Sequence, residues 1–338
     1  MSLPAFKYLR PDSLEEAIFL LGSHPGEIMI MAGGTDLLVS LKQKLFQTAR
    51  VLDVKAVSEL RGLEFTETDG LKVGAATRLS DLAADKLVQT RYTGVAEAAQ
   101  SVGAAAHRSM GTLGGNVCLN NRCWYFNQSP TWRTTFGSCY RLGGESCLVA
   151  KGTARCRAAY CGDTAPSLLV MGAQVKIGGP TGFRTVPLDE LYTGDGKASI
   201  RLAPGELVVE ITVPIPEVGV GTAYRKYRLR DSIDFPLAGA ACAIGLDDEG
   251  TCTHARIALT AVGSRPERCP QAEDVLAGRK LTAGVISEAV EAARSQARPL
   301  RTTVMPPPYR RTMVALMVRN AIRAAASRCE SGWEEYPS

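Results

Sequence analysis

The chain has 338 residues, which is more than one average domain and fewer than three, so we expect two domains. Its hydrophobic fraction of 45% and charged fraction of 22% are typical of a globular chain with a sizeable core, and they exclude a disordered protein, a collagen and a coiled coil. The net charge of +5 comes with no long basic run, so we expect no nucleic-acid partner. Because the sequence has neither a membrane-length apolar run nor a recognisable secretion signal, we expect no membrane contact and a cytoplasmic location.

The first part of the chain shows helix and strand signals in turn. Ser13 and Glu16 form a capping-box pattern at the start of an amphipathic helix that Gly22 is expected to end. The other elements predicted up to Pro214 are strands at 28–31, 51–54, 71–75 and 207–213 and helices at 95–106 and 165–171.

The last part has a run of strands followed by a run of helices. The predicted elements are strands at 223–229, 238–246 and 255–262 and helices at 286–297 and 309–326. This order favours an α+β fold over a doubly wound sheet, and we place the domain boundary at residue 216.

Two glycine-rich turns follow predicted elements. The first is Ala32-Gly33-Gly34-Thr35-Asp36, and the second is Gly111-Thr112-Leu113-Gly114-Gly115-Asn116. Neither has the dinucleotide-binding or the P-loop spacing. Glycines still allow a backbone to approach a phosphate, and threonine and asparagine side chains add donors. The sequence alone leaves open whether the turns bind an anion or are simply tight turns.

An irregular stretch between residues 118 and 161 is dense in cysteine. It contains Cys118, Cys123, Cys139, Cys147, Cys156 and Cys161, with six basic residues, one acid and seven aromatic residues. In a reducing cytosol these cysteines are not expected to form disulfides. Four thiolates can hold zinc or an iron–sulfur cluster, and the four-residue gaps in the tightest pairs match a zinc ribbon poorly. A loop with incidental buried thiols is the third possibility.

At this point the sequence resembles a known family. The two glycine turns, together with Gly162-Asp163-Thr164-Ala165-Pro166 and the apolar run after it, resemble the FAD-binding medium subunits of molybdenum hydroxylases, such as xanthine and carbon monoxide dehydrogenases. The resemblance extends from about Phe6 to Arg328. The cysteine-rich insertion resembles that of 4-hydroxybenzoyl-CoA reductase beta subunits, which bind an extra 4Fe-4S cluster.

The resemblance implies a two-lobed FAD domain of the vanillyl-alcohol oxidase/PCMH type, at residues 1–216. Its lobes would span about 1–56 and 57–216, with the cluster loop at about 117–161. A C-terminal α+β domain of the molybdenum hydroxylase flavoprotein type would follow at 217–330, and FAD would lie between the domains.

The resemblance also assigns individual residues. It implies cluster ligands at Cys123, Cys139, Cys147 and Cys156, which leaves out Cys118 and Cys161. Lys226, next to Arg225, matches a family lysine near the flavin ring, and Asp163 would meet the ribityl or adenine part. The full set of implied FAD contacts is Met31, Ala32, Gly33, Gly34, Thr35, Asp36, Thr77, Gly111, Thr112, Gly114, Gly115, Asn116, Asp163 and Lys226.

The implied function is electron transfer, with no catalytic residue in this chain. Electrons would enter at the 4Fe-4S cluster from an external carrier such as ferredoxin, and would pass by way of FAD to a partner's 2Fe-2S cluster. The partners would be a small 2Fe-2S subunit and a large subunit with the molybdenum cofactor, in a dimer of heterotrimers that removes the hydroxyl group of 4-hydroxybenzoyl-CoA to give benzoyl-CoA in aromatic compound degradation. Two alternatives remain: an FAD subunit serving another substrate, and a structural or binding protein with a zinc-holding loop.

Overall fold

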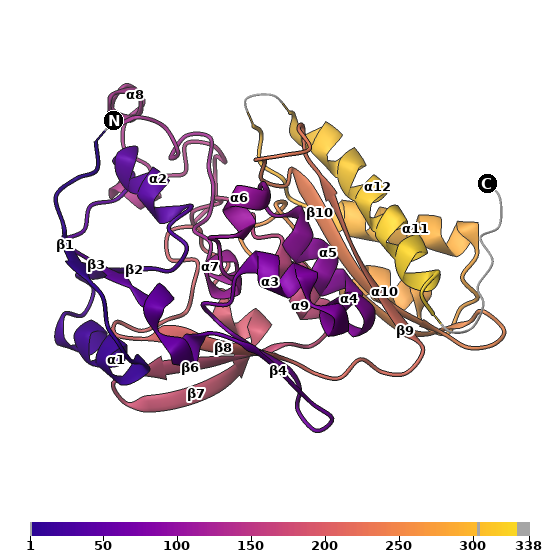
Figure 1. The fold of residues 1–338 in the computed structure, drawn as a ribbon. Coiled ribbons are helices and arrows are strands. Elements are labelled where there is room, and N and C mark those ends of the chain that lie inside the picture. Colours follow the sequence, from indigo (N-terminus) through magenta and orange to yellow (C-terminus); the bar gives the residue numbers. More distant parts are fainter. Residues whose placement is uncertain (1, 303–304, 330–338) are drawn as a thin grey trace.

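Figure 1 shows the chain as a computed structural model that describes residues 2–302 and 305–329. Three sheets, with three, five and four strands, are each built from consecutive strands of the sequence. Helices pack against these sheets without alternating regularly with the strands (Figure 1). The predicted α+β class is therefore confirmed.

The first sheet is parallel, with the strand order β1-β3-β2. The Ser13 hydroxyl accepts a hydrogen bond from the backbone N–H of Glu16 (3.1 Å), as the capping pattern predicts, although the helix runs one residue past Gly22. Ala17 and Leu21 pack in the same apolar cluster as Leu52 of the central strand. The elements of this part are β1 (Lys7–Leu9), α1 (Leu14–Ser23), β2 (Ile28–Met31), α2 (Leu37–Lys42), β3 (Arg50–Asp53), η1 (Val54–Ala56) and η2 (Ser58–Leu60).

The second sheet is antiparallel, with the order β4-β5-β8-β6-β7. Leu71 of β5 lies opposite Val213 of β8, so this pairing closes the segment between them into one unit. The strands are β4 (Leu63–Thr66), β5 (Gly70–Gly74), β6 (Gln174–Gly179), β7 (Gly182–Pro187) and β8 (Leu207–Val213). The helices are α3 (Leu79–Ala84), α4 (Lys86–Arg91), α5 (Thr93–Ser101), α6 (Ala105–Arg108), α7 (Leu113–Val117), α8 (Pro130–Thr134), η3 (Tyr140–Leu142), α9 (Thr164–Val170) and η4 (Leu188–Leu191).

The third sheet is antiparallel, with the order β12-β11-β10-β9, and β10 is buried along its whole length. Ala241 and Ala243 of β10 belong to the core of the second sheet and its helices, whereas Cys242 and Ile244 belong to the C-terminal core. Since successive strand residues face opposite sides, β10 is covered on both faces, with α12 on one of them (Figure 1). The elements are β9 (Val220–Tyr227), β10 (Ala238–Leu246), β11 (Cys252–Thr260), β12 (Glu267–Arg268), α10 (Pro270–Leu276), α11 (Ala283–Gln296) and α12 (Pro307–Ala326).

One predicted helix is interrupted. The helix expected at 95–106 is divided into α5 and α6 around Gly103, which has a φ of +50°. A Cβ at Gly103 would lie 2.9 Å from the Cβ of His107, so the sharp turn there requires a glycine. The strands at 28–31, 207–213 and 238–246 are confirmed as predicted, and the remaining elements end within three residues of their predicted limits.

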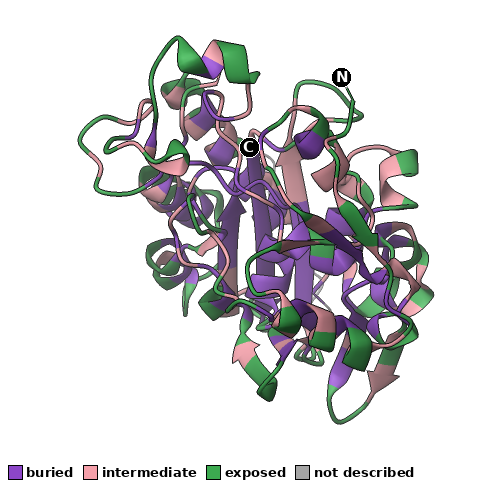
Figure 2. Ribbon diagram, turned by 90° about the vertical axis from the view of Figure 1, so that its left-hand side faces the viewer, coloured by how far each residue is buried: buried purple, intermediate pink, exposed green. Residues whose placement is uncertain are grey.

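Figure 2 shows the strands at the centre of the molecule as buried and many of the outer loops as exposed. In the described residues, no helix combines the length and apolar character that a membrane span requires. The predicted end of the second domain at residue 330 lies outside the described residues.

Candidate functional site

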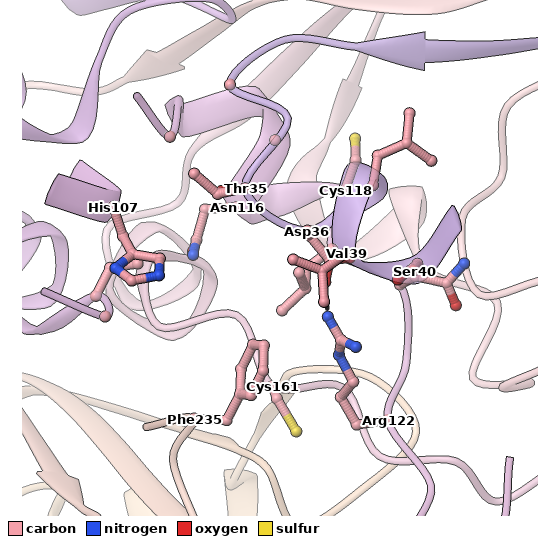
Figure 3. Close-up of a pocket in the computed structure, with 18 of the residues that line it drawn as sticks. Thr35, Asp36, Val39, Ser40, His107, Asn116, Cys118, Arg122, Cys161 and Phe235 are labelled. Carbon is pink, nitrogen blue, oxygen red and sulfur yellow. Dashed lines mark ion pairs between the residues drawn. The ribbon is translucent and has the colours of Figure 1, made fainter. Parts of the chain in front are cut away.

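A cavity of about 1010 Å³ opens where the two glycine turns, the cysteine-rich stretch and C-terminal residues meet (Figure 3). Its volume is at the upper end of the roughly 300–1,000 Å³ typical of small-molecule sites, so it can hold a ligand as large as a dinucleotide. It is lined by every implied FAD contact except Thr77 and Lys226. The fold therefore brings together two turns that are far apart in the sequence.

The first glycine turn connects β2 to α2 and packs directly against the second. A Cβ at Gly33 would lie 2.2 Å from the carbonyl oxygen of Met110, so only glycine permits this approach. Gly34 has a φ of +70°, a conformation that favours glycine. The Thr35 hydroxyl lies beside the second turn, 3.7 Å from where a Cβ at Gly111 would stand, and its side chain lines the cavity (Figure 3).

The second glycine turn begins α7, where the Thr112 hydroxyl accepts a hydrogen bond from the Gly115 N–H (3.2 Å). A Cβ at Gly114 would lie 2.8 Å from Ala75, whereas one at Gly115 would meet only the Thr112 Oγ1, at 3.1 Å. Gly115 is exposed and lines the cavity, so its lack of a side chain leaves space for a ligand rather than for the protein. Asn116 Oδ1 accepts from the backbone N–H of Thr164 (3.0 Å) and from its hydroxyl (2.8 Å), which ties α7 to α9.

Asp163 lines the cavity, but it is only 2% exposed and accepts hydrogen bonds from side chains of β9. Its two oxygens accept from the Tyr224 hydroxyl (2.7 Å) and from Lys226 Nζ (3.0 Å). Burial raises the pKa of Asp163, and Lys226 and Tyr224 oppose that rise. Lys226 therefore lies behind Asp163 and outside the cavity lining, and its contact with a flavin ring stays a prediction.

The neighbouring residue of β9 faces the other way, because strand side chains alternate. Arg225 pairs with Glu97 (2.9 Å), which also pairs with Arg328 of the C-terminal segment. Thr77 is buried, and its hydroxyl bonds both to the N–H and to the carbonyl of Gly62 (3.0 Å each). This geometry gives Thr77 and Arg225 structural contacts, and neither side chain lines the cavity.

The four implied cluster ligands converge on a second, small cavity. Cys123, Cys139, Cys147 and Cys156 all line it, with Tyr125, Phe126 and Arg141 around them. The open volume is about 10 Å³, close to that of one water molecule, so the thiols would have to move outward around a cluster. Within the described residues, no group of three or more potential ligands is placed to hold one metal ion. In a 4Fe-4S cluster each thiolate binds a different iron, so the four sulfurs need not converge as closely as ligands of a single zinc ion.

Aromatic rings and arginines surround this small cavity. The Arg141 guanidinium lies 4.0 Å from the ring centre of Phe126, and the Phe126 ring lies 5.8 Å from that of Phe46, just after α2. Burial raises the pKa of Cys156 to about 11. A metal would therefore have to displace the thiol proton on binding.

The two cysteines excluded from the ligand set lie elsewhere. Cys118 and Cys161 line the large cavity and not the small one. Burial raises the pKa of Cys118 to about 12 and that of Cys161 to about 11. All ten cysteines are free thiols. Cys123 alone of the six lines both cavities, so the two sites adjoin there.

Sequence reasoning missed several residues that line the large cavity. Arg122 forms an ion pair with Asp36, and its guanidinium lies 4.6 Å from the ring centre of Phe235. Burial lowers the pKa of Arg122 to about 10. His107 and Arg310 also line the cavity. Arg122 was visible as the neighbour of Cys123, but no sequence signal connects it to Asp36 or Phe235.

The chain was compared with families and proteins of known function. Residues 4–216 match the FAD binding domain in molybdopterin dehydrogenase, and residues 222–325 match the CO dehydrogenase flavoprotein C-terminal domain. The chain is 30% identical over 328 residues to the carbon monoxide dehydrogenase medium chain of Hydrogenophaga pseudoflava, covering 96% of this chain and 99% of that one. It is 26% identical over 321 residues to the xanthine dehydrogenase FAD-binding subunit of Escherichia coli O157:H7, covering 95% and 96%.

A solved structure agrees with these matches. Carbon monoxide dehydrogenase from Hydrogenophaga pseudoflava superposes with a TM-score of 0.81 at 29% identity, covering 97% of this chain and all of that one. The fold, the cavity and the matches together define an FAD-binding subunit of an oxidoreductase. The chain belongs to the family of FAD-binding medium subunits of molybdenum hydroxylases, which includes the carbon monoxide and xanthine dehydrogenase subunits.

Proposed function

We propose that the large cavity holds FAD with its diphosphate between the two glycine turns. The open face of Gly115 and the donors at Thr35 and Thr112 support this position, because backbone and side-chain donors around glycines suit an anion. FAD supplies exchange of one or two electrons when bound, and the protein places it. The remaining predicted contacts, including Asp163 and Lys226, are part of this proposal, as is the division into 1–216 and 217–330.

We further propose that the cysteine-rich loop holds a 4Fe-4S cluster through Cys123, Cys139, Cys147 and Cys156. The observation that carries this proposal is that the four thiols line one small cavity, whereas Cys118 and Cys161 line the other. The aromatic rings would limit water, and the nearby arginines would favour an anionic cluster. Zinc is the second candidate, but it would need four ligands drawn around one ion.

The partners proposed are a large subunit with the molybdenum cofactor and a small 2Fe-2S subunit, in a dimer of heterotrimers in the cytoplasm. The relative named a medium chain supports a complex of several subunits. An external one-electron carrier such as ferredoxin would meet the outer face of the cysteine-rich loop. Lys151 and Arg155 of that loop are exposed and supply positive charge for such a contact.

The proposed reaction of the complex is removal of the hydroxyl group of 4-hydroxybenzoyl-CoA. The support is the cysteine-rich insertion and its similarity to the beta subunit of that reductase. The relatives carry names as different as caffeine dehydrogenase and nicotinate dehydrogenase, so an FAD subunit for another substrate is the second candidate.

The anaerobically purified and reduced complex tests this function directly. Addition of 4-hydroxybenzoyl-CoA should restore the absorption of oxidised flavin and yield benzoyl-CoA. A flavin band that is bleached in the oxidised complex by another aromatic or heterocyclic compound, with no response of the reduced complex to this thioester, would favour the second candidate, because a dehydrogenase takes electrons from its substrate. A chain that contains zinc and no flavin would contradict both.

A further inference from the structure

Asp36 is an unexpected residue at a diphosphate-binding turn. Its carboxylate lines the same cavity as the glycines, and it would repel a diphosphate placed there. It does not serve the helix that follows, because its side chain makes no capping hydrogen bond to α2. The side chain is 29% exposed, so water screens its charge only in part.

The cavity contains three acidic side chains among its described lining residues, and each has a cationic partner. Asp163 pairs with Lys226 (3.0 Å), and Asp234 pairs with Arg230 (2.6 Å). Asp36 pairs with Arg122, which extends toward it in Figure 3. This pattern leaves no carboxylate of the described lining without a cation, as an anionic ligand requires.

Arg122 is held in position from two further directions. Its backbone N–H donates to the Ala159 carbonyl (2.7 Å), and the Ala159 N–H donates back to the Arg122 carbonyl (2.8 Å). Its guanidinium lies over the ring of Phe235, which comes from the C-terminal part of the chain. The fold therefore already restricts the rotamers of Arg122 and holds its guanidinium beside the first glycine turn. FAD binding would cost little further side-chain entropy at this residue.

We propose that Arg122 is a positioning residue of the FAD site, which neutralises Asp36 so that the first glycine turn can accept the diphosphate. This inference deepens the proposed function and rests on FAD occupying the large cavity. Arg122 immediately precedes Cys123, so the cysteine-rich loop would supply a charge that the FAD site needs. Asp36 would then act through Arg122 rather than as a direct ligand of the diphosphate.

The test is a set of variants of the full chain, prepared without oxygen and freed of FAD, each titrated with FAD. Arg122→Gln leaves the carboxylate of Asp36 beside the diphosphate, so the Kd should rise at least about tenfold, as expected when a partly buried charge loses its partner. Asp36→Asn removes the repelling carboxylate itself, so adding it to Arg122→Gln should restore FAD binding. Such recovery in the double variant is the sign of coupling between two residues in contact.

The matched control is Arg133→Gln, since Arg133 is a buried arginine of the same loop that donates to the Lys44 carbonyl (3.0 Å) and lines neither cavity. It should leave the FAD Kd near that of the natural chain, and all variants should retain the iron of the loop. A double variant that binds FAD no better than Arg122→Gln would overturn the inference, since Arg122 would then contact FAD directly or act on the fold.

If Arg122→Gln does not fold, Arg122→Lys takes its place in the FAD titration. It keeps the positive charge but loses the planar group that lies over Phe235, so its Kd should rise by less than about tenfold, and adding Asp36→Asn should remove that rise; a rise that persists in the double variant would contradict the neutralising role. A natural chain that binds no FAD would instead contradict the proposed function.

Discussion

Replacing Gly115 by Ala separates ligand binding from protein stability. Gly115 lies in α7, and a Cβ there would meet only the Thr112 Oγ1, at 3.1 Å, while the rest of its surroundings is open cavity. Alanine in place of glycine favours a helix by up to about 1 kcal/mol. Displacing the capping hydroxyl by a few tenths of an ångström costs part of a cap worth about 1 kcal/mol. The two effects oppose each other, so the stability of the FAD-free chain should change by less than about 1 kcal/mol.

The same methyl group would stand where the diphosphate meets the backbone. We therefore expect the FAD Kd to rise at least about tenfold, which corresponds to about 1.4 kcal/mol. Thermal unfolding of the FAD-free chain measures stability, and quenching of FAD fluorescence on titration measures the Kd.

Gly284→Ala is the matched control. Gly284 lies in the first turn of α11, after a threonine cap at Thr282, and its Cβ would lie 3.8 Å from that hydroxyl. It does not line the cavity, so FAD binding should not change. A Gly115→Ala chain with the natural FAD affinity would refute the proposed position of the diphosphate. Gly33 cannot serve in this experiment because its Cβ would collide with the Met110 carbonyl.

Further predictions concern the buried groups behind the cavity. Lys226→Met should lower the free energy of unfolding by about 3 kcal/mol, measured in urea, because it leaves buried Asp163 without its cation, and Asp163→Asn should recover part of that loss. Since burial raises the folded-state pKa of Asp163, the Lys226→Met chain should be least affected in acid and should lose stability as pH rises from the unfolded-state pKa through the raised one. Cys118→Ala and Cys161→Ala should each cost at most about 1–2 kcal/mol and keep the paramagnetic signal of the reduced loop cluster; loss of that signal in a folded chain would show that the ligand set is wrong. Because burial raises the pKa of Cys118 to about 12 and that of Cys161 to about 11, both thiols should resist iodoacetamide in the folded chain and react after unfolding, as mass spectrometry can follow.

Local patterns in the sequence predicted the secondary structure well where one physical signal dominates. Strand β10 is a continuous run of small apolar residues, and the structure buries it on both faces. The cap at Ser13 is set by its own helix and needs no partner from elsewhere. The prediction of a single helix at 95–106 is wrong at Gly103. A helical sequence pattern tolerates one glycine, whereas the packing here requires a positive φ at that residue.

The candidate site was predictable only in part. The glycine turns could be found because each is contiguous in the sequence, and the cysteines because they are dense between residues 118 and 161. The resemblance then assigned FAD contacts to the turns and four of the cysteines to a cluster. The ion pair between Asp36 and Arg122 could not be found, since it joins segments that only the fold brings together. The same holds for Lys226, whose position behind Asp163 depends on which face of β9 it occupies.

We propose that this chain carries an iron–sulfur cluster as well as FAD. Iron and acid-labile sulfide, counted per chain in the anaerobically purified complex with and without Cys139→Ser, test it most directly. The natural complex should contain about four more irons per chain than its 2Fe-2S partner accounts for, as a 4Fe-4S cluster requires, and Cys139→Ser should lose them and retain FAD. Equal iron in both preparations, or zinc in place of iron, would contradict the cluster.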